Sequence, residues 1–190
     1  MIIVLYEDWA LAEIASGRRC CPCGGRLRPW AHARARLIRQ LDGSHTSLRP
    51  RRVICAECGR TQVVLPAECL PRRRDSVESI GAALLMAAKG PGHRRIAAKL
   101  NRPESTVRNW LRRARRSAGW LREAGLLAAT ELDVGQGPMP VRETELAETV
   151  DALGHAAATA TRALGLVGAP PWQIITMVSR GQLLASVPDG

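Results

Sequence analysis

The sequence predicts an α+β fold, in which a small β-rich zinc ribbon is followed by a mostly α-helical part containing a helix-turn-helix. Three observations support this class. Two Cys-x-x-Cys-Gly knuckles stand near the start, short alternating stretches typical of strands follow them, and helical periodicity begins near residue 76. With 12 Pro and 17 Gly in 190 residues, we expect small modules in series.

Four modules are expected along the chain. Residues 1–17 are predicted to form a strand and a short helix, 18–71 the zinc ribbon, 72–131 the helix-turn-helix domain with an extended third helix, and 132–190 an acidic helical segment. Either Asp75 or Ser76 can cap the first helix of the third module.

The charge of the chain is distributed unevenly. Its formal net charge is +11, but residues 1–122 hold 25 of the 28 basic and 9 of the 17 acidic residues, and residues 123–190 are net acidic. Because basic side chains attract phosphate, a polyanion is expected to contact the first two-thirds of the chain. Nearly all of the basic residues are Arg, which suits bidentate contacts to phosphate or guanine and equally fits a GC-rich genome.

The sequence favours a cytoplasmic, nucleoid-associated protein. It has no run of 18 apolar residues, and the opening Met1–Leu5 run lacks the basic region and the cleavage site of a signal peptide. In a reducing compartment, cysteines in Cys-x-x-Cys pairs are better interpreted as metal ligands than as disulfides.

The two knuckles predict a structural Zn²⁺ site with four thiolate ligands, Cys20, Cys23, Cys55 and Cys58. Each knuckle is followed by Gly, and 31 residues separate them. A closed S₄ shell leaves no position for a reactive water, so this zinc is expected to hold the ribbon together.

Several alternatives remain for the cysteines. Cys21 can replace Cys20 as the first ligand, and Cys69 is either a small buried thiol or an alternative ligand. Redox-active dithiols are a further possibility, although no thioredoxin-like βαβ pattern surrounds the pairs. His32 and His45 are expected at the surface, because four thiolates already complete the shell.

Arginines are dense within the predicted ribbon. They are expected to grip a phosphate backbone, and the alternative is a merely solvated face. The residues concerned are Arg26, Arg28, Arg34, Arg36, Arg39, Arg49, Arg51 and Arg52.

Residues 93–111 fit the helix-turn-helix template. Apolar residues such as Ile96 and Val107 fall where the two helices must pack, and Asn101 stands where the turn needs a left-handed residue. Arg102 occupies a usually apolar position, so we expect its stem to lie along the core with the charged head outside.

In this motif the second helix, here residues 104–116, enters the major groove of DNA. Arg pairs with guanine and Asn with adenine, so base contacts are expected from Ser105, Arg108, Asn109 and Arg112. Phosphate contacts are expected from Thr106, Arg94, Arg95 and Lys99. A plain helical hairpin is the alternative, which the ten basic residues against one acid over 93–122 disfavour.

The motifs together resemble an uncharacterised bacterial family built from a zinc ribbon and a helix-turn-helix. The resemblance covers about residues 1–122 and rests on CxxCGG, Pro29-Trp30, His32-Ala-Arg34, Leu48 to Val53, CxxCG, Val64-Leu-Pro66, Arg72-Arg-x-Asp75, Ile80-Gly81, Arg95-Ile-Ala97 and Thr106 to Leu111. Members look like the DNA-binding front end of insertion-sequence transposases. Cys21 departs from the knuckle of the family, which begins Cys-Pro.

These observations predict a sequence-specific DNA-binding protein without catalysis, either a transcriptional regulator or a transposition accessory factor, with double-stranded DNA and a transposase or integrase as partners. The alternatives are a DNA-cutting transposase or integrase fragment and an RNA- or ribosome-associated zinc protein. An apolar stripe over residues 143–164 either packs within the chain or forms a homodimer.

Overall fold

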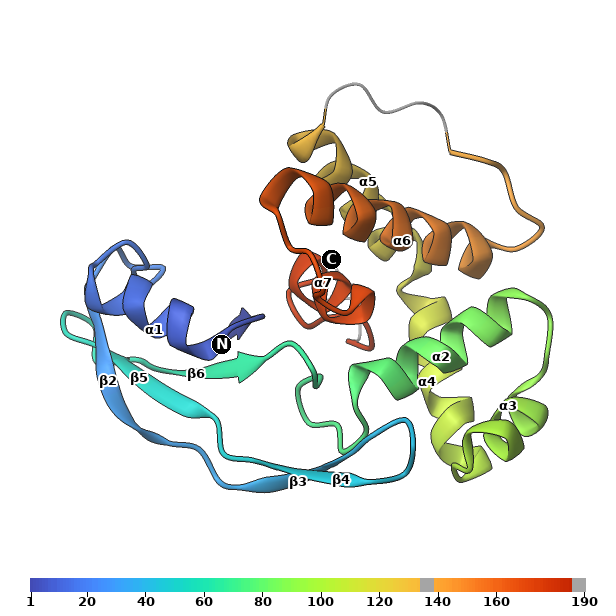
Figure 1. Ribbon diagram of the computed structural model, residues 1–190, viewed down its shortest axis with the longest axis horizontal. Coiled ribbons are helices and arrows are strands. Elements are labelled where there is room, and N and C mark those ends of the chain that lie inside the picture. Colours follow the sequence, from blue (N-terminus) through green and yellow to red (C-terminus); the bar gives the residue numbers. More distant parts are fainter. Residues whose placement is uncertain (134–138, 186–190) are drawn as a thin grey trace.

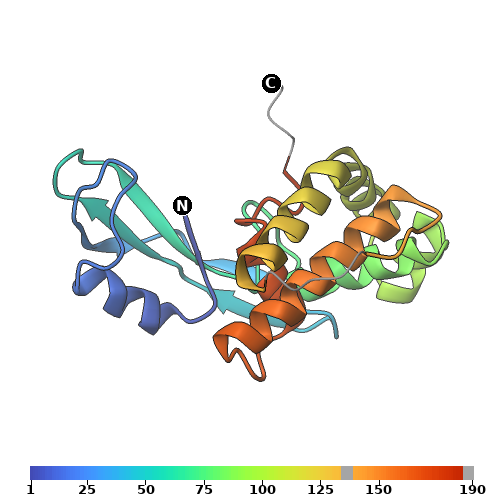
Figure 2. The same cartoon turned by 90° about the horizontal axis from the view of Figure 1, so that it is seen from above.

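The computed structural model describes residues 1–133 and 139–185. A small β-sheet region comes first and helices follow, so the α+β class is confirmed. Figure 2 shows the strands and α1 at one end of an elongated molecule and helices α2 to α7 at the other. None of the described helices is long and apolar enough to cross a membrane.

The main sheet has four strands in the order β1-β6-β5-β2 (Figure 1). β1 pairs with β6 in parallel, whereas β5 pairs with β6 and β2 in antiparallel register, and β3 and β4 form a separate hairpin. The strands are β1 (Ile2–Val4), β2 (Leu27–His32), β3 (Arg36–Arg39), β4 (His45–Leu48), β5 (Arg51–Cys55) and β6 (Thr61–Pro66).

The opening strand and helix pack on the rest of the sheet. β1 extends the sheet, and α1 (Glu7–Ala15) packs against β2 and β6. Ile14 of α1 is fully buried in one core with Leu27, Val53 and Val64 of the strands. The predicted modules 1–17 and 18–71 therefore share one hydrophobic core.

The helical part has a core of its own, to which helices α2 to α7 contribute. Local signals explain several helix ends: the Ser76 hydroxyl accepts a hydrogen bond from the N–H of Ser79, and Pro171 occupies the first turn of α7. The helices are α2 (Val77–Ala88), α3 (His93–Leu100), α4 (Glu104–Arg116), α5 (Ala118–Leu132), α6 (Glu145–Leu164) and α7 (Pro171–Val178).

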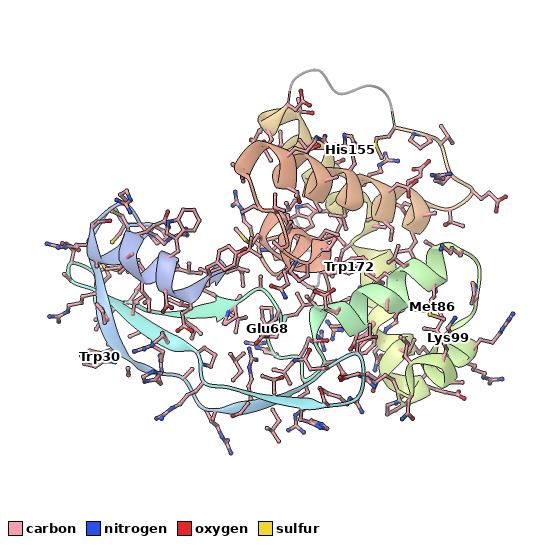
Figure 3. The ribbon with its side chains drawn as sticks, viewed as in Figure 1. Trp30, Glu68, Met86, Lys99, His155 and Trp172 are labelled. Atoms are coloured by element: carbon pink, nitrogen blue, oxygen red, sulfur yellow. The ribbon has the colours of Figure 1, made fainter. Side chains whose placement is uncertain are left out.

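Two close contacts set the positions of these helices. A Cβ added at Gly125 of α5 would lie 3.1 Å from the backbone of Ala152 in α6, so these two helices approach closely. Trp172 of α7 lies against α2 (Figure 3), where a Cβ at Gly81 would be 2.1 Å from the indole ring. A methyl group at Gly81 would overlap the indole ring, and one at Gly125 would need α6 to shift by a few tenths of an ångström.

The expected extended third helix is two helices. α4 ends at Arg116 and α5 begins at Ala118, because the backbone at Ser117 leaves the helical conformation (φ −104°, ψ 6°). The Ser117 hydroxyl donates to the carbonyl oxygen of Ala185 at 2.8 Å, which ties the break to the chain beyond α7.

The apolar stripe of α6 is used inside the chain. Leu146, Val150 and Leu153 are buried against the other helices, and α6 packs chiefly on α5. The side chains expected to form a homodimer through 143–164 are therefore part of the core, while Leu164 at the end of the stripe is exposed. This corresponds to the alternative of packing within the chain.

Candidate metal centre and nucleic-acid interface

Four cysteine thiols converge at one end of the sheet. Cys21 and Cys23 lie in the loop between α1 and β2, Cys55 ends β5, and Cys58 lies in the turn before β6. Their Sγ atoms all lie within 4.8 Å of one another. This loop and turn are at the end of the sheet far from α3 and α4 (Figure 1).

The spacing of the sulfur atoms suits a single tetrahedral metal ion. Cys21 Sγ lies 3.8 Å from Cys58 Sγ, and Cys23 Sγ lies 3.5 Å from Cys55 Sγ. Metal–sulfur bonds of about 2.3 Å in tetrahedral geometry place two sulfurs roughly 3.8 Å apart. The four thiols could therefore hold a metal ion with little rearrangement.

Glycines shape both knuckles. Gly24 (φ 84°) and Gly59 (φ 68°) adopt left-handed backbone conformations that disfavour other residues. Their N–H groups donate to the carbonyl oxygens of Cys21 and Cys55, at 2.8 and 3.1 Å. These turns bring the two cysteines of each knuckle to the same side.

The first thiol of the cluster is that of Cys21, which corrects the expectation that Cys20 occupies this position. Cys20 forms an isolated bridge with Arg26, and its thiol donates to the carbonyl oxygen of Gly17 at 3.3 Å. Successive residues of an extended segment point to opposite sides. Cys21 is accordingly buried and faces the other thiols, whereas Cys20 is exposed.

The thiols differ in acidity. A backbone hydrogen bond from Arg60 and a hydrogen bond with Cys23 lower the pKa of Cys58 to about 7. Despite a backbone hydrogen bond from Cys58, burial of the thiol raises the pKa of Cys55 to about 12. A bound cation would favour the thiolate form of all four.

The remaining candidate ligands lie outside this cluster. Cys69 is fully buried with Ile38 and Leu65, and it accepts a hydrogen bond from Arg36 at 3.2 Å. Burial raises the pKa of the Cys69 thiol to about 11. His32 and His45 are exposed, as expected for surface histidines.

α3 and α4 are joined by a tight turn. Asn101 adopts the left-handed conformation (φ 49°, ψ 53°), as the sequence predicted, and the N–H of Arg102 donates to the carbonyl oxygen of Ala97 at 3.0 Å. Ile96 and Val107 are fully buried between the two helices and the rest of the core. The turn therefore fixes the angle at which α4 leaves α3.

The outer sides of these helices carry the residues predicted to contact DNA. On α4, Ser105, Arg108, Asn109 and Arg112 follow one another at spacings of three, one and three, so they form one stripe. All four are exposed, and Thr106 beside them is half-buried. On α3, Arg94, Arg95 and Lys99 are exposed, and Lys99 points away from the molecule (Figure 3).

Arg102 is placed otherwise than expected, because its charged head is buried. The side chain is 2% exposed, and its Nε donates to Asp75 Oδ1 at 2.9 Å. It also donates to the carbonyl oxygens of Leu100 and Gln40. The acidic partner thus lies in the segment just before α2, where Asp75 was expected only as a candidate helix cap.

The ribbon arginines fall into two groups. Arg36, Arg39 and Arg52 are partly buried and bond to Cys69, Asp75 and Thr61 respectively. The exposed group comprises Arg26, Arg28, Arg34, Arg49 and Arg51. Within the exposed group, Arg51 forms an ion pair with Glu7 at 3.6 Å and Arg26 donates to the carbonyl oxygen of Ala15 at 3.4 Å.

One family model matches part of the chain. Residues 20–110 match the Domain of unknown function (DUF6431). The match includes all four clustered cysteines, α2, α3 and the first half of α4. No curated protein and no solved structure matches the chain.

Proposed function

We propose that this protein binds double-stranded DNA with sequence preference, and that α3 and α4 form its helix-turn-helix. The observation that carries the proposal is the exposed stripe of Ser105, Arg108, Asn109 and Arg112 on a helix whose opposite side is buried. A side-chain stripe on such a rigid helix can be presented to base edges in a major groove. The left-handed turn at Asn101 fixes the orientation of α3 relative to the start of α4.

The arginine and asparagine of this stripe are the residue types that read base pairs. Arg108 could form a bidentate pair with guanine, and Asn109 could do so with adenine. Arg112 donates to Asn109 Oδ1 at 3.1 Å, which would orient the amide toward the groove. Arg94, Arg95, Lys99 and Thr106 would contact the flanking phosphates.

Zinc is the metal that the cysteine cluster would hold in this proposal. Cys21, Cys23, Cys55 and Cys58 form an all-sulfur donor set, and such tetrahedral sets are typical of structural Zn²⁺. The site lies at the end of the sheet far from α4 (Figure 1), so the metal would stabilise the ribbon and not contact the bases. The exposed ribbon arginines would then add sequence-independent affinity for the DNA backbone.

Together these features fit a transcriptional regulator or a transposition accessory factor, acting with a transposase or integrase. Selection from a library of random duplexes, at a stated salt concentration, tests the proposal. We expect enrichment of one short motif by the full chain. Recovery of unselected sequences, or tighter binding to single-stranded RNA than to the enriched duplex, would refute it.

Two classes of variants should separate the roles. Arg108→Ala and Asn109→Ala should each weaken binding to the enriched duplex by roughly 10- to 100-fold and relax preference at one position. Arg28→Ala should weaken all duplexes alike and lower the slope of log K against log salt by about 1. Arg162→Ala, on an exposed position of α6, is the control with an unchanged affinity.

A further inference from the structure

A basic pocket lies where four distant parts of the chain meet. It has a volume of about 560 Å³ and is lined by Met1, by the connector before α2, by α4, and by the segment after α7. Four arginines contribute to the lining: Arg72, Arg73, Arg113 and Arg180. Figure 1 shows the connector and the end of α7 side by side near the middle of the molecule.

The described lining of this pocket carries positive charge without a compensating carboxylate. No carboxylate belongs to the lining residues that the structure describes, and none of the four arginines forms an ion pair with another described residue. Burial and the nearby charge of Arg113 lower the pKa of Arg73. Like charges held together in this way favour an anion between them.

Two of the arginines also have an unfavourable backbone conformation. Arg72 (φ 59°) and Arg180 (φ 50°) are left-handed, and Asn101 is the third non-glycine residue with positive φ among residues 1–133 and 139–185. Asn tolerates this conformation, whereas Arg has no such preference. Both conformations belong to turns: Arg73 N–H donates to the carbonyl oxygen of Leu70 at 3.2 Å around Arg72, and Gly181 N–H donates to that of Thr176 at 2.7 Å around Arg180, at the end of α7. The two turns place both arginines at the pocket.

The lining also has an apolar side. Met1 and Pro71 contribute accessible apolar atoms to it, whereas Leu70 and Leu184 are almost fully buried. The pocket therefore offers cationic and hydrophobic contacts together. Its volume falls within the range of small-molecule sites, about 300–1,000 Å³. A backbone phosphate of DNA would need the charges but not a recess of this size.

We propose that this pocket binds a phosphorylated small molecule of nucleotide size, with the arginines on the phosphates and the apolar residues on the remainder. Arg113 belongs to α4 and also lines a smaller hollow with Arg112 and Arg116. A ligand here would therefore touch the same helix that we propose to read DNA. The binding site itself does not depend on the DNA proposal.

Isothermal titration of the full, metal-loaded chain with ATP and with inorganic pyrophosphate tests this, with adenosine as the probe lacking phosphate. The variant is Arg72→Gly/Arg180→Gly, because glycine accepts both left-handed conformations and the fold should be retained or stabilised. We expect wild-type binding of ATP, and a loss of about tenfold in affinity for each arginine removed. The matched control is Arg115→Ala/Arg162→Ala, which removes two exposed arginines outside the pocket.

Three outcomes would overturn the proposal. Wild-type protein that binds neither ATP nor pyrophosphate has no such site, and equal losses in both double variants indicate only general attraction to the basic surface. If the double variant weakens binding to the enriched duplex while no nucleotide binds, the phosphate in this pocket comes from the DNA backbone. A failed search for a preferred duplex would leave the nucleotide titration fully interpretable.

Discussion

Arg102 Nε and Asp75 Oδ1 lie 2.9 Å apart in the interior, where the two side chains are 2% and 9% exposed. The same Asp75 oxygen accepts from Arg39 Nε at 2.8 Å, and Arg102 also donates to the carbonyl oxygen of Gln40. Arg39 and Gln40 belong to the β3–β4 hairpin, whereas Arg102 follows α3. One carboxylate therefore joins the ribbon to the turn between α3 and α4.

Asp75→Asn should destabilise the protein by about 3–5 kcal/mol, because it leaves two guanidinium groups without their anion, one of them buried. Urea denaturation monitored by circular dichroism measures the change in free energy of unfolding. Asp42→Asn is the matched control: this exposed aspartate accepts hydrogen bonds from Ser44 in the hairpin turn and should change stability by roughly 0.5 kcal/mol or less. Equal effects of the two substitutions would contradict a central role for Asp75.

Local features of the fold were predictable from the sequence because their causes are local. Capping by Ser76, the left-handed turn at Asn101 and Pro171 at a helix start each depend on a few neighbouring residues. The burial of the Arg102 guanidinium group was not predictable, because its partner Asp75 is 27 residues away in the sequence and the hairpin is more distant still. A buried charge needs a partner, and spacing in the sequence does not reveal one at that distance.

The metal cluster shows the same limit within a single motif. Regular spacing favours Cys20, yet the bridge between Cys20 and Arg26 sets which side of the chain faces the other knuckle. That bridge depends on the path of the loop from Cys20 to the start of β2. The spacing of the cysteines does not determine this path. Which of the two adjacent cysteines faces the other knuckle is therefore decided only by the backbone conformation of the loop.

Adjacent cysteines offer a matched test of the metal site. Cys21→Ser should reduce bound zinc and unfold the ribbon, because it removes one of four thiolate ligands. Cys20→Ser should keep about one zinc per chain, since the Cys20 thiol is outside the cluster. Metal content of the purified variants, together with far-UV circular dichroism, decides between them, and zinc lost from Cys20→Ser alone would restore the original assignment.

Gly25→Ala should disturb the same site without removing a ligand. An added Cβ would lie 2.6 Å from Cys55 Sγ and 2.0 Å from Glu57 Oε2. The Glu57 side chain can rotate away, but Cys55 is buried and held by its neighbours, so the sulfur must shift. We expect weaker zinc binding in competition with a chromophoric chelator.

The double variant Gly25→Ala/Glu57→Ala identifies the responsible contact. It removes the flexible carboxylate and leaves the contact with Cys55 Sγ, so zinc affinity should stay low. Full recovery of affinity in the double variant would show that Glu57, and not the thiol, limits the space beside Gly25.

Two glycines of the α5–α6 pair should respond to alanine with opposite signs. Gly154 lies within α6, is exposed, and has open space around its Cβ position, so Gly154→Ala should stabilise the fold by about 0.5–1 kcal/mol through helix propensity. Gly125 of α5 faces the backbone of Ala152 at 3.1 Å, and there the helices must separate to admit a methyl group. Gly125→Ala should therefore destabilise by about 1–2 kcal/mol despite the same gain in propensity. Urea midpoints of the two variants measure both effects, and a stabilised Gly125→Ala would mean that α5 and α6 are packed less closely than this structure has them.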